Sequence, residues 1–212
     1  MRSSIMLLSA ASILFSISAA AESTKYMGIS IGQGYTKSSS ISLDNTLASQ
    51  GITAQSTINV KDTAYKIFVG YQFTQKFSIE GGYANLGQVK AAGTFTAPFP
   101  GDTFNDTIKA SGWNVDAIGS LSVMNNLEAY ARLGLIRAKT TSNIIANTAF
   151  GTITFPNQAT STSTHYGAGL QYKLTQNWAM RGEYERYNRI GNPLTTGQGD
   201  IQVYSLGARY QF

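Results

Sequence analysis

Apolar and polar residues alternate along the chain in eight segments, each of about the length of a strand. In the last segment Tyr204, Leu206 and Tyr210 fall on one face of an extended chain, whereas Ser205 and Arg209 fall on the other. About ten residues suffice for a tilted strand to cross a bilayer. The eight segments that show this alternation are 25–37, 62–73, 77–87, 108–123, 127–140, 163–174, 178–188 and 200–212.

The connections between these segments alternate in length. Short turns are expected at 74–76, 124–126 and 175–177, and long polar loops at 38–61, 88–107, 141–162 and 189–199. In outer-membrane barrels the short turns lie in the periplasm and the long loops outside the cell. The pattern therefore predicts an all-β fold, an eight-stranded antiparallel up-and-down transmembrane β-barrel with four long extracellular loops, three short periplasmic turns and both termini in the periplasm.

The two faces of the predicted strands differ in composition. One face carries small aliphatic residues between aromatic ends, and the other carries charges of both signs. A soluble lipocalin-like barrel or a β-sandwich would turn the apolar face inward, but a lipid-facing band between two aromatic girdles accounts better for both faces. We expect a periplasmic girdle of Phe73, Phe77, Trp178, Tyr210 and Phe212, and an outer girdle of Tyr65, Tyr83, Trp113, Tyr166 and Tyr204.

The first residues have the pattern of a secretory signal peptide. A basic start at Arg2 precedes an apolar run from Ile5 to Phe15, and small residues follow up to Ala21. A membrane anchor is the alternative, but the run is shorter than the ~20 residues that a spanning helix needs. We expect a signal peptide at 1–21 and one barrel domain at 22–212. The chain has no cysteine, which excludes disulfides and lipoprotein acylation.

Several of these segments resemble a known family. Tyr65-Lys-Ile-Phe-Val-Gly-Tyr-Gln-Phe73, Asn126-Leu-Glu-Ala-Tyr-Ala-Arg-Leu-Gly134 and Tyr204-Ser-Leu-Gly-Ala-Arg-Tyr-Gln-Phe212 are similar to strands of the OmpA-type outer-membrane barrel. The resemblance implies an eight-stranded barrel of the Gram-negative cell envelope. It covers the transmembrane domain and not the family's peptidoglycan-binding domain, so cell-wall tethering is not expected. The barrel-assembly machinery is an expected partner, through the C-terminal strand that ends in Phe212.

Charged residues on the inward face predict a polar core. Eight strands leave room inside only for side chains, so buried charges must be paired. The expected lumen network is Glu80, Asp116, Arg132, Arg181, Glu183, Glu185 and Arg209. In the OmpA family an inward Glu and an inward Arg, matched here by Glu80 and Arg181, form a gate. Ile118 and Gln171 stand where the family has the exchange partners, so fixed ion pairs are favoured over a switch.

Basic residues gather at the predicted outer ends of the strands. The formal net charge is +5, and a basic collar suits the anionic phosphates of lipopolysaccharide. Snorkelling of long side chains at an interface is the other interpretation. Nucleic acid is not an expected partner of an exported protein. The collar is Lys37, Lys61, Lys66, Lys90, Lys109, Arg137, Lys139, Arg186 and Arg189.

Catalytic and metal chemistry find little support in the sequence. Ser163 and His165 share the inward parity near the outer rim, but no acid stands near them in the sequence. A nucleophile needs a base and an orienting group, so we expect no catalytic, metal or cofactor residues. An enzyme acting on lipid A is the third and weakest functional hypothesis.

Two of the predicted loops carry aromatic residues. Loop 88–107 contains Phe95, Phe99 and Phe104, and loop 141–162 contains Phe150 and Phe155. These residues either cap the barrel mouth or form a contact surface for an unknown ligand, and the cap is slightly favoured. The sequence as a whole predicts a non-enzymatic outer-membrane protein with a structural and surface-interaction role. A narrow, low-conductance porin is the alternative.

Overall fold

The computed structural model describes residues 24–37, 40–49 and 51–212, and the predicted signal peptide lies outside them. Nearly all of this part of the chain is β-strand, with one helix. That helix is neither long nor apolar enough to cross a membrane. In chain order the elements are β1 (Thr24–Thr36), α1 (Ser40–Ser49), β2 (Thr53–Asn59), β3 (Lys61–Thr74), β4 (Phe77–Ala97), β5 (Thr103–Met124), β6 (Leu127–Thr148), β7 (Gly151–Lys173), β8 (Trp178–Asn192) and β9 (Gly197–Gln211).

Eight of the strands form a closed antiparallel ring. Each pairs with its neighbours in the order β1, β3, β4, β5, β6, β7, β8 and β9, and β9 returns to β1 with Ile31 opposite Leu206. The short strand β2 stands outside the ring and pairs with the outer part of β4. Closure satisfies backbone groups between strands, as a bilayer requires. The predicted eight-stranded up-and-down barrel is confirmed.

The strands turn their apolar residues outward. Ile31, Trp113 and Leu206 are 63%, 70% and 66% exposed, whereas Glu80 on the inner face is fully buried. An outer surface this apolar is unfavourable in water and favourable in lipid, so the ring carries a membrane-facing band. The predicted parity of the two faces is confirmed.

Threonine side chains shape two of the three short turns. Thr74 Oγ1 accepts hydrogen bonds from the backbone N–H groups of Lys76 (3.2 Å) and Phe77 (3.1 Å). Thr175 Oγ1 does the same for Asn177 (3.3 Å) and Trp178 (3.0 Å). A hydroxyl that satisfies turn donors lets the chain reverse within two or three residues.

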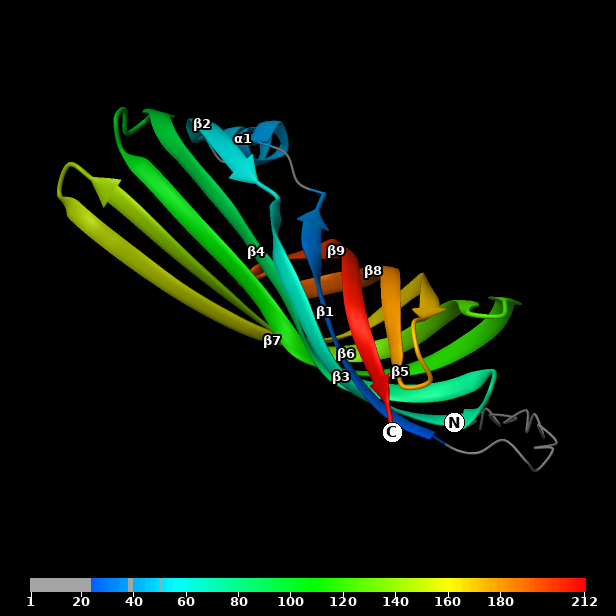
Figure 1. Ribbon diagram of the computed structural model, residues 1–212. Coiled ribbons are helices and arrows are strands. Elements are labelled where there is room, and N and C mark those ends of the chain that lie inside the picture. The colour runs from blue at the N-terminus through cyan, green and yellow to red at the C-terminus, as the bar shows by residue number, and fades with distance from the viewer. Residues whose placement is uncertain (1–23, 38–39, 50) are drawn as a thin grey trace, which may run out of the picture.

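Two predicted long loops are instead continuations of strands. Strands β4 to β7 are 21 to 23 residues long, and Figure 1 shows their hairpins, in green and yellow, reaching beyond β8 and β9. The predicted loops 88–107 and 141–162 were therefore wrong. Pairs such as Val89 with Ile108 and Ser142 with Asn157 continue the ladder there, because threonine and isoleucine favour strands even where no strict alternation marks them.

The other two predicted loops are only partly irregular. Segment 38–61 contains α1 and β2, and β2 pairs with β4 through Ile58 opposite Ala91. Segment 189–199 is shortened from both sides, because β8 continues to Asn192 and β9 begins at Gly197. In Figure 1, α1 and β2 lie beside the outer part of β4.

Glycine is required where the first and last strands meet. A Cβ atom added at Gly32 would collide with the carbonyl oxygen of Tyr204 and with Ser205 Cα, whereas one at Gly119 would have nothing within 4 Å. We expect Gly32→Ala to destabilise the barrel by about 1–3 kcal/mol, the usual cost of overpacking. Gly119→Ala is the matched control and should leave stability unchanged. Equal urea midpoints of unfolding for the two variants in lipid vesicles would contradict the close approach of β1 and β9.

Candidate functional site

Several side chains in the lumen converge on the carboxylate of Glu80. Its carboxylate is fully buried and receives Arg181 Nη1 at 2.6 Å and Arg132 Nη2 at 2.8 Å. The hydroxyl of Tyr26 donates a third hydrogen bond to it at 2.9 Å. Side chains from β1, β6 and β8 thus contact one carboxylate of β4. The predicted ion pair between Glu80 and Arg181 is observed.

Arg132 joins the remaining acids to this centre. Its guanidinium lies 3.1 Å from Glu183, 3.0 Å from Glu185 and 3.4 Å from Asp116. Pairing of this kind offsets the cost of removing these charges from water. We call the ion-pair network the set Lys66, Glu80, Asp116, Arg132, His165, Arg181, Glu183 and Glu185.

The collar prediction is wrong for Lys66. Its side chain is only 4% exposed, and Nζ lies 2.7 Å from Glu183 and 2.8 Å from Glu185 inside the barrel. Lys66 stands between the outward residues Tyr65 and Ile67, so its parity points inward. Its length carries the ammonium across the lumen to β8.

Arg209 also departs from its predicted role. It lies in the lumen but forms no ion pair within the described residues. Its guanidinium donates to the amide oxygens of Gln72 (2.9 Å), Gln171 (3.1 Å) and Gln211 (3.3 Å) and lies 3.7 Å from the centre of the Tyr26 ring. Neutral acceptors and an aromatic face, rather than carboxylates, therefore surround this cation.

The network contains a pair that sequence reasoning missed. His165 is fully buried, with Nε2 2.5 Å from Asp116 Oδ1 and its ring stacked on Tyr187 at 4.7 Å. The two residues come from β7 and β5 and meet across Gly134 of β6, which is opposite both. A Cβ atom at Gly134 would collide with both side chains. The shared inward parity and the glycine between them were the available signal.

The structure does not assemble a serine nucleophile. Ser163 Oγ donates to the backbone carbonyl of Arg189 at 3.1 Å, and no hydrogen bond joins it to His165 within the described residues. The one acid beside the histidine holds it inside a buried cluster. In the same part of the chain no group of His, Asp or Glu side chains is suited to hold a metal ion.

An apolar layer closes the lumen on the outer side of the network. Tyr187 is 1% exposed, and Ile136 and Ala138 are fully buried. The layer takes residues from six of the barrel strands, so it spans the interior. We call it the plug, and it consists of Ala64, Ala84, Leu86, Ala110, Ile136, Ala138, Tyr187, Ile190 and Val203.

Basic residues form a compact patch on the outside of β4, β5 and β6. Arg137 is opposite Trp113, and Lys139 is opposite Ser111, two residues further along the strands. Lys109 and Lys90 lie on the adjoining strands β5 and β4, beyond the level of Trp113. All four side chains are exposed, and none forms an ion pair within the described residues. We call Lys90, Lys109, Arg137 and Lys139 the rim patch.

The other collar residues lie apart from the rim patch. Arg186 is paired with Asp200 at 2.6 Å, which neutralises it locally. Lys37, Lys61 and Arg189 are exposed at the ends of other strands. The collar is therefore uneven, because four of its exposed bases lie together on β4 to β6 and the others lie singly at the ends of other strands.

The aromatic residues of the long hairpins do not act together as a cap. Phe95 and Phe104 pack on each other, with ring centres 5.2 Å apart, and Phe104 is buried. Phe150 is fully exposed, and Phe99 and Phe155 are 61% and 52% exposed. The favoured expectation of a cap is wrong for these three residues, because a cap would bury their side chains.

A double-mutant cycle measures the coupling inside the ion-pair network. We expect Glu80→Ala and Arg181→Ala each to destabilise the barrel by about 3–5 kcal/mol, because each leaves a buried charge without a partner. The double variant should lose less than the sum of the two. Urea unfolding in lipid vesicles, followed by tryptophan fluorescence, gives the three free energies. Additive losses would contradict the direct pairing.

The sequence matches the family model of the OmpA-like transmembrane domain over residues 20–212. It is 32% identical over 148 residues to outer membrane protein A of Shigella flexneri, covering 68% of this chain and 39% of that protein. The chain thus spans about two fifths of that relative's length.

Two solved structures share the fold. The outer membrane protein OprG of Pseudomonas aeruginosa superposes with a TM-score of 0.55 at 15% identity, over 89% of this chain and 96% of that one. The outer membrane protease OmpT of Escherichia coli gives a TM-score of 0.50 at 11% identity, over 89% and 97%. At such identities the likeness shows the fold alone. The family match over nearly the whole described barrel identifies the chain as a member of the OmpA-like transmembrane domain family, a multi-pass β-barrel of the outer membrane.

Proposed function

We propose that this barrel has a structural and surface-interaction role in the outer membrane and binds lipopolysaccharide through the rim patch. The observation that carries the proposal is the position of Arg137, opposite Trp113 of the aromatic girdle, with Lys139 and Lys109 just beyond it. An aromatic girdle marks the level of the lipid headgroups. The patch therefore lies where the phosphates of an anionic outer leaflet would be.

The chemistry of the rim patch suits a phosphate ligand. Lysine and arginine form charge-assisted hydrogen bonds with phosphate oxygens, and each basic residue near an anionic surface contributes about 1 kcal/mol. No carboxylate of the described residues competes for these four cations, in contrast to Arg186 with Asp200. Snorkelling would account for long basic side chains at the headgroup level on any strand, whereas four exposed bases without an ion pair lie close together on β4 to β6.

The lumen argues against a porin. The ion-pair network fills the interior at the level of Glu80, and the plug fills it again on the outer side. An ion would have to separate buried charge pairs and then cross an apolar layer. We therefore place the structural role above the low-conductance porin.

We also propose that the protein is not an enzyme. Fold alone does not decide this, since the barrel of OmpT belongs to a protease. The support comes from Ser163, whose hydroxyl is engaged by a backbone carbonyl, and from His165, which is fully buried. A substrate in the outer leaflet would reach neither of them.

The long hairpins are the proposed site of contact with other molecules. Phe150, in the turn between β6 and β7, is fully exposed, and Ile153 and Phe155 are exposed nearby on β7. Exposed apolar clusters of this kind mark interaction surfaces. With these hairpins outside the cell, both termini lie in the periplasm, where β9 is the proposed contact for the barrel-assembly machinery.

Neutralising the rim patch tests the lipopolysaccharide proposal. We expect the combined change Lys90→Gln, Lys109→Gln, Arg137→Gln and Lys139→Gln to weaken binding of purified lipopolysaccharide at least about tenfold, measured by titration in nanodiscs. The control variant Lys25→Gln with Lys76→Gln removes charge from the opposite end of the barrel and should bind normally. Unchanged affinity in the rim variant would refute the proposal.

Planar-bilayer recordings separate the structural role from the porin. We expect the refolded barrel to give no discrete current steps, because the network and the plug both occupy the lumen. Heat-dependent migration on a gel should first show that the sample is folded. Reproducible steps from that sample would instead favour a channel.

A further inference from the structure

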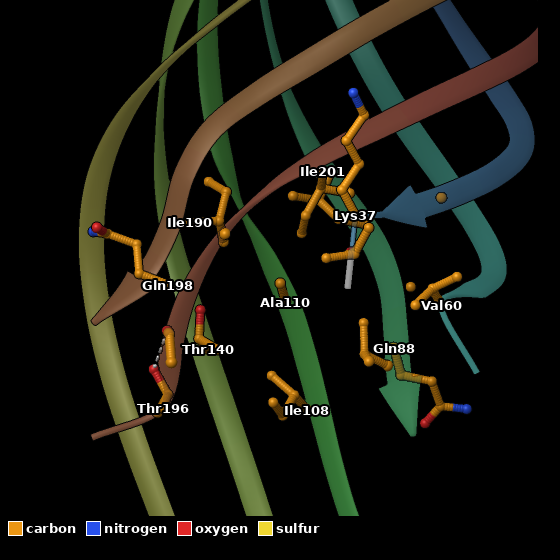
Figure 2. Close-up of a pocket in the computed structure, with 17 residues that line it drawn as sticks. Lys37, Val60, Gln88, Ile108, Ala110, Thr140, Ile190, Thr196, Gln198 and Ile201 are labelled. Atoms are coloured by element: carbon orange, nitrogen blue, oxygen red, sulfur yellow. Dashed lines mark hydrogen bonds between the residues drawn. The ribbon is translucent and has the colours of Figure 1, made fainter. Parts of the chain in front are cut away.

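The mouth of the barrel holds a cavity of about 230 Å³ on the outer side of the plug. It lies between the end of β1, the bulge of β4, the middle of β5 and β6, and the β8–β9 hairpin. Figure 2 shows Ile108, Ile190, Ile201 and Val60 around the open space. Leu86 and Val89 complete the apolar part of its wall.

The floor of the cavity is the plug itself. Leu86, Ala110 and Ile190 belong to both. A bound molecule would therefore rest on an apolar layer and would have no passage to the charged network below. The site binds from the outer side and is separate from the rim patch, which faces away from the lumen.

One polar group beside the cavity lacks a partner. Thr140 is 2% exposed and lines the cavity, and its Oγ1 makes no hydrogen bond. A buried hydroxyl without a partner costs about 1–3 kcal/mol. Rotation between staggered rotamers exchanges the positions of the hydroxyl and the methyl group of Thr140. The hydroxyl can therefore form a hydrogen bond with a ligand oxygen in the cavity.

The lining limits the charge of a ligand. Among the residues that the structure describes, Lys37 is the only charged one in the wall, and Figure 2 shows its amino group pointing away from the other side chains. A carboxylate in the cavity would be desolvated without an ion pair, which is costly. At about 30 Å³ per non-hydrogen atom, the share of a water molecule in the liquid, the volume fits roughly eight such atoms.

We propose that the cavity binds a small, neutral amphiphile, with an apolar body against Ile108, Ile190 and Ile201 and one hydroxyl or carbonyl oxygen hydrogen-bonded to Thr140. A medium-chain alcohol or a similarly sized ketone has this chemistry. The site gives the barrel a binding function beyond its contacts with lipopolysaccharide, and it does not depend on them.

Methyl NMR of the barrel in nanodiscs tests the proposal, with 1-heptanol as the probe. Isoleucine methyl groups report on both surfaces, because Ile108, Ile190 and Ile201 line the cavity whereas Ile29, Ile31 and Ile67 face the lipid. We expect saturable shifts at the cavity methyl groups and only linear, unsaturated shifts at the lipid-facing ones. Heptanoate should bind more weakly than heptanol. Equal, unsaturated responses on both faces, or tighter binding of heptanoate, would overturn the proposal.

Two variants then locate the ligand. Thr140→Val keeps the shape and removes the hydroxyl, so we expect about a five- to tenfold weaker affinity for heptanol. Thr160→Val, at an exposed position of β7, is the matched control and should leave the affinity unchanged. Ile108→Trp fills the cavity and should abolish the saturable shifts at Ile190 and Ile201. Undiminished binding in either cavity variant, with the barrel folded, would refute the site.

Discussion

Pairing of β9 with β1 is the constraint on which the rest of this structure depends. In a bilayer the backbone groups of every strand must be satisfied by other strands, so the sheet has to close. Closure with eight strands leaves an interior that only side chains can fill. The outward face must then be apolar and the inward face must pack. Gly32 shows the cost of this closure, because its place against Tyr204 and Ser205 has no room for a side chain.

The charged residues that fill the interior favour one register of the strands. Glu80, Asp116, Glu183 and Glu185 come from three strands, and each pairs with an arginine or a lysine of another strand. A slip of one residue in any strand would turn its charges toward lipid. The net stabilisation from such pairs is small, since desolvation offsets most of the attraction. The penalty for breaking them is large, and it is this penalty that disfavours other registers.

The alternation of residues predicted the ring and its two faces because the period of two is dictated by strand geometry. The same rule puts Lys66 on the inward face, between Tyr65 and Ile67, but its charge near the outer end of the strand led us to expect it in the collar as well. The outer halves of β4 to β7 were missed because polar residues there leave little contrast between the two faces, although the threonines among them favour strands. His165 contacts Asp116 because the register of β5, β6 and β7 places both residues opposite Gly134. A single sequence does not determine the register of three strands.

The plug lowers the local dielectric constant around the ion-pair network and so strengthens its ion pairs. Ion pairs strengthen as water is excluded, and Tyr187, Ile136 and Ala138 exclude it from the outer side of Glu185 and Arg132. Tyr187 serves both layers, because its ring stacks on His165 and also belongs to the plug. The same apolar layer that isolates the charges leaves the mouth above it lined by isoleucine and by the unpartnered hydroxyl of Thr140. The outer surface of this layer is also the floor of the cavity in which the proposed small amphiphile would rest.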